Sequence, residues 1–372
     1  MRYLFFSSIA WDFYRLQEHE LPIYLSGKGN KCIYVNPLRY RDSEISSIRF
    51  RALSPKGTNG AQVIDRSTSL SRSFFSLLYE TFQNQRILRR SKPDIVVSFD
   101  HLMSSVICLY CWFKNITFVY AVSEDWVEVE QRWYMKLYIR YFAEPLLGSF
   151  SQAIISQSHR QAERFRKYNR RVHIIPNGKT LDFVERCGNE IDRGRHVGKV
   201  VNFIGTLRDN YDFDMLFDVF KEFPDIELNI YGSGILENKL SAKSKYYTNI
   251  HLKGNATPDI HQQLTAQSLF GVLPLKLNKQ NESTCPIKLF DYWAAGKAVI
   301  ASPTYELKKL AMDGGAVFAT SKQEFIDSIR LFLKDDGMMR SIGRKGYDKA
   351  LRQYNYNLIG PKFESIFNSS WN

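Results

Sequence analysis

Short apolar runs alternate with amphipathic stretches along most of the chain, as they do where parallel strands are connected by helices. The apolar runs of the first half are residues 3–6, 31–36, 94–100, 116–122 and 153–158. Those of the second half are residues 200–204, 227–231, 250–254, 271–274 and 298–301. A chain of 372 residues with 44% hydrophobic content is long enough for two cores. We therefore predict an α/β protein with two doubly wound, Rossmann-like domains.

A charged stretch without a sustained apolar period, residues 179–197, separates the two halves. Such a stretch is typical of a linker. We therefore place an N-terminal domain at residues 1–180, a linker at 181–198 and a C-terminal domain at 199–352. A last helix is expected within residues 353–372.

The positive charge of the chain is concentrated in its first half. Residues 1–180 hold 26 Lys and Arg against 15 Asp and Glu, whereas the remainder holds 25 against 23. This excess predicts an anionic partner for the N-terminal domain, which could be nucleic acid, a membrane surface or a phosphorylated lipid. No signature of an RNA- or DNA-binding module is present, so nucleic acid is the weakest of the three.

Residues 131–142 interleave aromatic and cationic side chains at helical spacing, which is the pattern of a helix that lies in a membrane interface. A helix packed on the core, with its long cationic side chains reaching solvent, explains the pattern nearly as well. No run approaches the roughly 20 apolar residues of a membrane span. We therefore expect a cytoplasmic protein.

The five cysteines, an odd number in a large chain, argue against a framework of disulfides. Cys108 and Cys111 form a CxxC motif inside an apolar run, with no second pair and no nearby His. We expect buried structural thiols here rather than a metal or redox site.

The segment 282–301 carries the clearest chemistry of the second half. Thr284 is a plausible N-cap for a short helix, on which Lys288, Asp291 and Tyr292 stand at i, i+3 and i+4 and so share one face. Lys288 and the backbone N–H groups of the helix N-terminus could bind a diphosphate, and Asp291 could accept hydrogen bonds from a ribose. An ordinary surface helix packed on the sheet is the alternative.

Polar residues follow two neighbouring strands of the first half. Glu124 and Asp125 come directly after the run 116–122, and His101 follows the run 94–100. Because ligands of open parallel sheets bind beyond the carboxyl ends of the strands, these side chains are candidates for a site. The alternative for the acidic pair is a solvated loop, and for His101 a structural role.

Several short motifs occur in a fixed order along the chain. They are Ser-Ser-x-x-Trp-Asp at 7–12, Ile-Pro-Asn-Gly at 175–178, Ile-Gly-Thr-Leu at 204–207, Tyr-Gly-Ser-Gly at 231–234 and the segment from Pro286 to Ala301. The ordered set resembles bacterial GT-B glycosyltransferases of surface-polysaccharide assembly, most of all the group of the xanthan glucuronosyltransferase and the teichuronic-acid glycosyltransferases. The resemblance implies two Rossmann-like domains facing a central cleft, with a C-terminal helix that crosses back to the first domain.

The resemblance also implies roles for individual residues. It places the nucleotide-sugar donor at Gly205, Thr206, Leu207, Arg208, Tyr231, Gly232, Leu275, Ile287, Lys288 and Asp291. It places acceptor contacts at Ser8, Trp11, Asp12 and His101, and the catalytic carboxylate at Glu124, with Asp125 beside it.

Departures from the large retaining family 4 concern the diphosphate grip and the donor helix. Thr206 and Tyr211 stand where that family has Arg and Lys, and Ser283 stands where it has Glu. The xanthan-type group instead inverts the sugar carbon, with a carboxylate that takes the proton of the acceptor hydroxyl. This chemistry requires no metal and no further cofactor, and we expect the carboxylates of Asp212 and Asp214 to cap a helix.

The resulting hypothesis is an inverting, metal-independent transfer of a sugar, with UDP the expected nucleotide, to a polyprenyl-diphosphate-linked glycan. It takes place at the inner face of the plasma membrane, with the basic N-terminal domain in peripheral contact with the lipid. The alternatives are a non-catalytic assembly subunit, a retaining family-4-like enzyme and a sugar-nucleotide epimerase.

Overall fold

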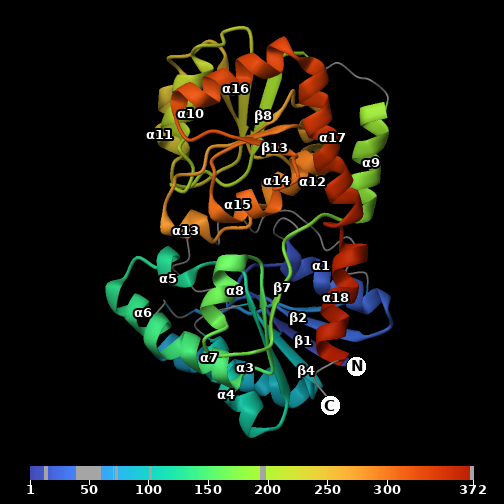
Figure 1. Ribbon diagram of the computed structural model, residues 1–372. Helices are drawn as coiled ribbons and strands as arrows, with labels where there is room; N and C mark the ends of the chain where they lie inside the picture. The colour runs from blue at the N-terminus through green and yellow to red at the C-terminus, as the bar shows by residue number, and fades with distance from the viewer. Residues whose placement is uncertain are drawn as a thin grey trace. The chain divides into compact units, whose positions relative to one another are not determined.

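A computed structural model describes residues 1–11, 16–38, 60–69, 71, 74–99, 103–192 and 198–368. The chain forms two compact units (Figure 1). The first comprises Met1–Pro176 together with Gly360–Asn372, and the second comprises Asn177–Ile359. Both are α/β units with parallel strands, as the alternation of apolar runs predicts.

The first unit is built on a seven-stranded sheet in the order β3-β2-β1-β4-β5-β6-β7, and all its pairs are parallel. The strands are β1 (Arg2–Phe6), β2 (Lys31–Val35), β3 (Gln62–Ile64), β4 (Ile95–Ser98), β5 (Thr117–Val122), β6 (Ala153–Ser156) and β7 (Val172–Ile174). The central strands are buried along almost their whole length because helices cover the sheet, which is why they read as continuous apolar runs.

Helices connect these strands. They are α1 (Gln17–Gly27), α3 (Phe74–Ser91), α4 (Ser104–Phe113), α5 (Trp126–Val129), α6 (Trp133–Tyr138), the π-helix η1 (Ile139–Ala143), α7 (Glu144–Phe150) and α8 (His159–Phe165). The last helix, α18 (Tyr356–Asn368), ends in the first unit, where the ring of Phe367 lies 5.3 Å from that of Tyr3. The expected C-terminal return of the chain is therefore present.

The second unit holds two three-stranded parallel sheets, ordered β10-β9-β8 and β11-β12-β13. The strands are β8 (Val200–Ile204), β9 (Glu227–Tyr231), β10 (Ile250–Gly254), β11 (Gly271–Leu273), β12 (Val299–Ala301) and β13 (Ala316–Phe318). The edges of the two sheets meet where the Leu269 N–H donates to the Val200 carbonyl at 2.7 Å. The Ser268 hydroxyl accepts from the Asn202 N–H at 3.0 Å beside it.

The helices of the second unit begin with α9 (Leu181–Asp192). The others are α10 (Phe213–Phe220), α11 (Glu237–Ser244), α12 (Pro258–Gln267), α13 (Lys279–Glu282), α14 (Ile287–Ala294), α15 (Tyr305–Leu310), α16 (Lys322–Lys334) and α17 (Asp336–Arg352). The predicted linker at 181–198 is wrong for the residues of α9, which pack on α12, α14 and α17. Val184 and Cys187 are fully buried there. Two buried positions make too narrow an apolar stripe to be recognised among the surrounding charged residues, so the helix was not predicted.

All five cysteines are free and buried, in agreement with the expectation of structural thiols. Burial raises the pKa of the Cys108 thiol to about 12 and also raises that of Cys111. Both thiols are therefore protonated at neutral pH, when a thiolate would be needed for metal binding or redox chemistry.

Trp293, on α14, is the largest fully buried side chain of the second unit. Its indole N–H donates to the Gly315 carbonyl at 3.0 Å. The ring also packs directly against Gly346 of α17, where a Cβ would collide with it. The ammonium of Lys349 lies over the ring, 5.4 Å from its centroid. Packing of α14 against α17 therefore depends on this ring.

We predict that Trp293→Ala lowers the free energy of unfolding by about 3–5 kcal/mol, because the substitution leaves a cavity and an unpaired carbonyl. Urea denaturation followed by circular dichroism measures the change. Trp133→Ala is the control: this indole is 72% exposed, so its loss is expected to cost less than about 0.5 kcal/mol. Equal effects at the two positions would contradict the assignment of Trp293 to the core.

Candidate functional site

The loops at the carboxyl ends of β8, β9 and β11 are joined by backbone hydrogen bonds. The Gly205 N–H donates to the Tyr231 carbonyl at 2.9 Å, and the Leu207 N–H donates to the Ser233 carbonyl at 3.0 Å. Tyr211 forms an isolated bridge with Leu275, after β11. The predicted Gly-Thr-Leu and Tyr-Gly-Ser-Gly turns therefore lie together, where parallel sheets bind ligands.

Two glycines allow these loops to come close. Gly205 has φ +153° and Gly232 has φ +146°, values that side chains with a Cβ rarely adopt. A Cβ on Gly232 would collide with the carbonyl of Gly205, and a Cβ on Gly205 would occupy the place of the Lys288 ammonium. The backbone of the first turn therefore lies directly against the amine of the lysine on α14.

Lys288 holds its charge in an unusual environment. Its side chain is largely buried, its Nζ donates to the Tyr211 hydroxyl at 3.1 Å, and the rings of Phe203 and Tyr211 lie 5.1 and 4.8 Å away. Among the described residues, no carboxylate lies within 4.0 Å of this amine. Buried cations are normally paired, so an anion is the expected partner of Lys288.

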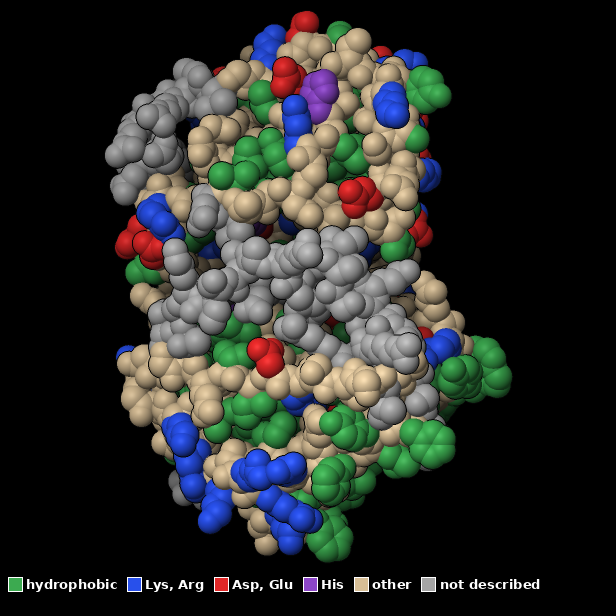
Figure 2. All heavy atoms as spheres, turned by 180° about the vertical axis from the view of Figure 1, so that it is seen from behind, with side chains coloured by type: hydrophobic (Ala, Val, Ile, Leu, Met, Phe, Trp, Pro, Cys, Tyr) green, Lys and Arg blue, Asp and Glu red, His purple; other side chains and the backbone are tan. Residues whose placement is uncertain are grey.

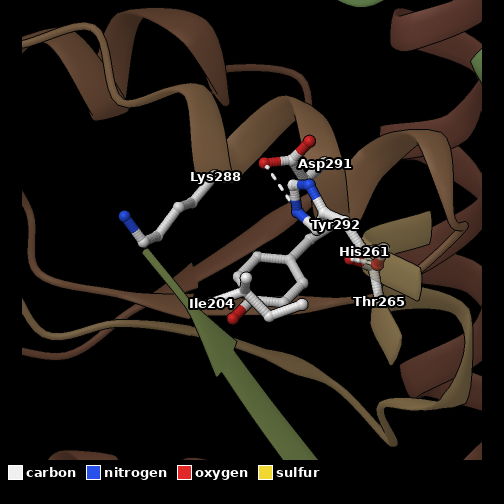
Figure 3. Close-up of a pocket in the computed structure, with 6 residues that line it drawn as sticks. All are labelled: Ile204, His261, Thr265, Lys288, Asp291 and Tyr292. Carbon is white, nitrogen blue, oxygen red and sulfur yellow. Dashed lines mark hydrogen bonds and ion pairs between the residues drawn. The ribbon is translucent and has the colours of Figure 1, made fainter. Parts of the chain in front are cut away.

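Asp291, one turn further along α14, does have protein partners. Its carboxylate lies 2.6 Å from the Lys179 ammonium and 3.6 Å from Nε2 of His261, on α12. Burial alone would raise the pKa of Asp291, but Lys179 and His261 outweigh it and the pKa is lowered. Figure 3 shows the carboxylate turned toward His261 and the Lys288 amine pointing elsewhere.

His261 itself is held in its neutral form. Burial lowers the pKa of the imidazole, and although Asp291 raises it, Lys179 and Lys288 add to the lowering. A neutral ring can donate one hydrogen bond and accept another. The pocket formed by Ile204, His261, Thr265, Lys288, Asp291 and Tyr292 therefore combines a cation, a carboxylate and a neutral imidazole (Figure 3).

The N-terminus of α14 differs from its prediction in one respect. The hydroxyl of Thr284 donates to the Gln280 carbonyl at 3.0 Å, so Thr284 caps nothing in α14. Pro286 occupies the N-cap position, and no described side chain accepts from the first N–H groups. The Leu289 N–H donates to the Pro286 carbonyl at 3.1 Å, which leaves the N–H groups of Ile287 and Lys288 for an anion.

The structure brings together most of the predicted donor residues, though in different roles. The side chains of Leu207 and Leu275 are buried and help to shape the loops, whereas Arg208 is exposed. Thr206, Tyr231 and Ile287 are partly exposed. Tyr292 is structural, because its hydroxyl donates to the Asn202 carbonyl at 2.8 Å.

Sequence reasoning missed Lys179 and His261. Lys179 directly follows the Ile-Pro-Asn-Gly motif, a position that could have drawn attention to it. Its ammonium lies 4.6 Å from the Phe183 ring centroid as well as beside Asp291. His261 stands in a polar helix whose sequence gives no sign of its contact with Asp291.

In the first unit, the predicted acidic pair lies after β5. Glu124 is partly exposed, and Asp125 is buried with both carboxylate oxygens 2.8 Å from Nη1 of Arg164. Nη2 of Arg164 lies 2.8 Å from the carboxylate of Glu144, at the start of α7. The guanidinium therefore ties Asp125 in place, and the solvated-loop alternative is wrong for Asp125.

Two of the residues predicted to contact the acceptor, Ser8 and Trp11, have partners within the first unit. The hydroxyl of Ser8 donates to the carboxylate of Glu18 at 3.1 Å. Trp11 is only 4% exposed, because its ring packs against those of His19 and Tyr34, and its contact with the acceptor stays a prediction. Asp12 and His101 lie outside the described residues.

Of the two carboxylates expected to cap α10, Asp212 does so, whereas Asp214 is held in ion pairs. Asp212 caps the helix by accepting from the Met215 N–H at 2.9 Å. Asp214 forms ion pairs with Lys239 and Lys243 at 2.8 and 2.6 Å. In the described part of the chain, no three His, Cys, Asp or Glu side chains come together as metal ligands.

Two family models match the chain, one on each half. A model described as "Glycosyltransferase Family 4" matches residues 35–183, and one described as "Glycosyl transferase-like" matches residues 211–359. The chain is also 27% identical over 137 residues to TuaH of Bacillus subtilis (strain 168), whose name assigns it to teichuronic acid biosynthesis as a glycosyltransferase. This match covers 36% of the chain and only 34% of TuaH.

Solved structures match over nearly the whole length. Anabaena HepE in complex with UDP-glucose has a TM-score of 0.73 at 12% identity, with 99% of this chain and 100% of that chain covered. Sucrose-phosphate synthase from Thermosynechococcus elongatus has a TM-score of 0.78 at 13% identity, with 99% of each chain covered. At these identities the likeness shows a shared fold, the GT-B arrangement expected from the motifs.

Glu144 provides a pH-dependent test of the buried cluster. Burial raises the pKa of its carboxyl from 4.5 to about 7, with Arg164 opposing and Asp125 adding to the rise. The folded state therefore binds a proton that the unfolded state has released between pH 4.5 and 7. The stabilisation is complete below pH 4.5 and is lost as the pH rises through 7, a change on the order of 3 kcal/mol.

We therefore predict that the unfolding free energy of the wild type, minus that of Glu144→Gln, falls as the pH rises from 4.5 to 7. Urea denaturation at a series of pH values measures this difference. Glu237→Gln, at an exposed position of α11, controls for the loss of one carboxylate. A difference that stays constant or grows with pH would contradict the assignment.

Proposed function

We propose that the chain is a GT-B glycosyltransferase that transfers a sugar from a UDP-sugar to a lipid-linked glycan, and the glycosyltransferase match on each half supports this proposal. The relative in teichuronic acid biosynthesis supports a role in polysaccharide assembly. The neighbours solved with UDP and UDP-glucose support UDP as the nucleotide.

The observation that carries the donor proposal is the ammonium of Lys288, which lies against the Gly205 turn and has no carboxylate partner among the described residues. A diphosphate placed there would meet this charge, the uncapped N-terminus of α14 and backbone N–H groups in one location. Because the diphosphate gains negative charge as the sugar leaves, the same groups stabilise the transition state more than the bound donor. We propose that they do so without a metal ion.

Asp291 and His261 suit the ribose end of the donor. The lowered pKa of Asp291 keeps its carboxylate ionised and able to accept from hydroxyl groups. The ion pair with Lys179 already compensates the buried charge of this carboxylate. A ribose therefore needs only to form hydrogen bonds with it, and no further counter-charge is required. Neutral His261 can donate or accept on the other side of the pocket.

For the acceptor, we propose that Glu124 takes the proton of the attacking hydroxyl, which leads to inversion at the sugar carbon. Asp125 is the poorer candidate because Arg164 holds both its oxygens. We further propose that the acceptor sugar is carried on a polyprenyl diphosphate, in keeping with the excess of Lys and Arg in residues 1–180. The protein would then act at the inner face of the plasma membrane.

We predict that UDP binds the purified protein without Mg²⁺ and that Lys288→Ala weakens this binding about 10- to 100-fold, the usual loss for a charge-assisted contact. Isothermal titration calorimetry measures the affinity, with Lys334→Ala, an exposed lysine of α16, as the control. Unchanged affinity in Lys288→Ala would remove the proposed donor site. Binding of UDP without turnover on any acceptor would favour a non-catalytic subunit.

We predict that Glu124→Gln lowers kcat about 10²- to 10⁴-fold, the usual contribution of a general base, while the affinity for UDP stays unchanged. Glu128→Gln in the adjacent helix α5 is the control, since it removes a carboxylate from the same surface. Full turnover in Glu124→Gln would exclude Glu124 as the base. A product with retained anomeric configuration, measured by NMR, would contradict the inverting mechanism.

A further inference from the structure

Among the described residues, most of the exposed aromatic side chains lie on a few helices of the first unit. Every Trp and Phe side chain among the exposed described residues lies on α3, α4, α6 or η1. In the second unit, the exposed large hydrophobic side chains of the described residues are scattered aliphatic ones and one Tyr, with no Trp or Phe among them. We call the exposed side chains of these four helices the aromatic face.

Helix α3 exposes four apolar residues in its first half and buries polar residues as well as Leu88. Phe75, Leu78, Tyr79 and Phe82 are exposed by 74, 52, 38 and 64%, and their i, i+3, i+4, i+7 spacing forms one stripe. On the buried side, Glu80 and Asn84 pair with the guanidinium of the buried Arg66, at 3.4 and 2.5 Å. An exposed apolar stripe of this length is unusual for a surface helix and marks a surface that contacts something less polar than water.

Helix α4 adds a second exposed apolar side. It is ten residues long and apolar nearly throughout. Its inner side packs in the core through residues such as Ile107 and Cys108, while Leu109, Trp112 and Phe113 are exposed by 40, 52 and 78%. An apolar helix of this kind is normally enclosed on all sides, yet half of this one faces outward.

The segment α6–η1 is the third part of the face. Trp133, Tyr141 and Phe142 are exposed by 72, 63 and 68%, with Tyr134, Leu137 and Tyr138 exposed beside them. A core helix, one of the two explanations of this sequence pattern, is therefore wrong for these residues. The three parts are neighbours in the fold: α3 packs on α4, α4 packs on α7, and η1 runs directly into α7. Figure 2 shows hydrophobic side chains gathered on this unit, with Lys and Arg side chains close by.

The exposed charges carried by the four helices themselves are positive. Along α3 the aromatic stripe continues into the exposed Arg86, Arg89 and Arg90, and α6–η1 carries Lys136 and Arg140. The only acidic residue on α3, α4, α6 or η1 is the buried Glu80. A face with Trp, Tyr and Phe bordered by cations matches the interface of an anionic bilayer, where rings lie at the headgroup level and Lys and Arg contact the phosphates.

We propose that the aromatic face binds the surface of an anionic lipid bilayer, with α3, α4 and α6–η1 lying in the plane of the interface. No helix among the described residues is long and apolar enough to cross a membrane, and a face of side chains from several short helices needs no spanning segment. This inference gives the membrane contact of the proposed function a definite location. It rests on that function only for the expectation that such contact occurs.

Flotation of the purified full chain with vesicles tests the proposal. We expect binding to vesicles of equal parts phosphatidylcholine and phosphatidylglycerol, and much weaker binding to phosphatidylcholine alone. The double variant Phe113→Asp/Phe142→Asp should lower the partition coefficient at least about tenfold. Ile235→Asp/Tyr246→Asp, which changes residues of the second unit exposed by 79 and 88%, is the matched control and should bind as the wild type does.

A charge series separates the roles of cations and rings. Arg86, Arg89 and Arg90 changed together to Gln should weaken binding on the order of 100-fold and reduce its dependence on salt. The same loss of charge at the exposed Lys308, Lys309 and Lys334 should have little effect. The proposal is overturned by wild-type protein that does not float with anionic vesicles, or by aromatic variants that float equally well.

Pairing of two copies through this face is the competing outcome. Light scattering would then show a dimer that Phe113→Asp/Phe142→Asp converts to a monomer, while binding to vesicles is absent. Because flotation uses neither donor nor acceptor, its failure leaves the UDP-binding prediction intact. Conversely, loss of UDP binding in Lys288→Ala with normal flotation concerns the donor site alone.

Discussion

The close approach of the Lys288 ammonium to the backbone at Gly205 is the constraint on which the second unit's site depends. It requires a glycine at the end of β8, a second glycine after β9 so that the two turns can touch, and a helix that starts at the level of the strand ends. It also requires Trp293 to seat α14 against α17. A positive charge is thereby held among aromatic rings, where the absence of bulk water strengthens its attraction for an anion.

Much of this arrangement could be predicted from local sequence. The apolar runs indicated the strands, and the spacing of Lys288 and Asp291 placed both on one side of α14, where they line one pocket. The start of that helix was harder to predict. Thr284 is a residue type that often caps helices, but its hydroxyl donates to the Gln280 carbonyl of the preceding turn instead. Helix α9 was missed because its buried positions are few and are surrounded by charged residues.

The partners of Asp291 could not be predicted in the same way. Lys179 and His261 are distant in sequence from each other and from α14, and only the packing of α9 and α12 against α14 brings them to the carboxylate. The same holds in the first unit, where Arg164 joins Asp125 to Glu144 from three separate elements. Charge partners of this kind are properties of tertiary structure, and local periodicity carries no information about them.

The overlap between the Lys288 ammonium and the Cβ that Gly205 lacks has a consequence for how the sequence can change over time. A larger residue at position 205 is compatible with the loop only if the side chain at position 288 becomes shorter or turns away. Either change removes the cation from the strand end. The two positions are therefore expected to vary as a pair among descendants of this chain, and a lineage that lost one of them would have little to preserve the other.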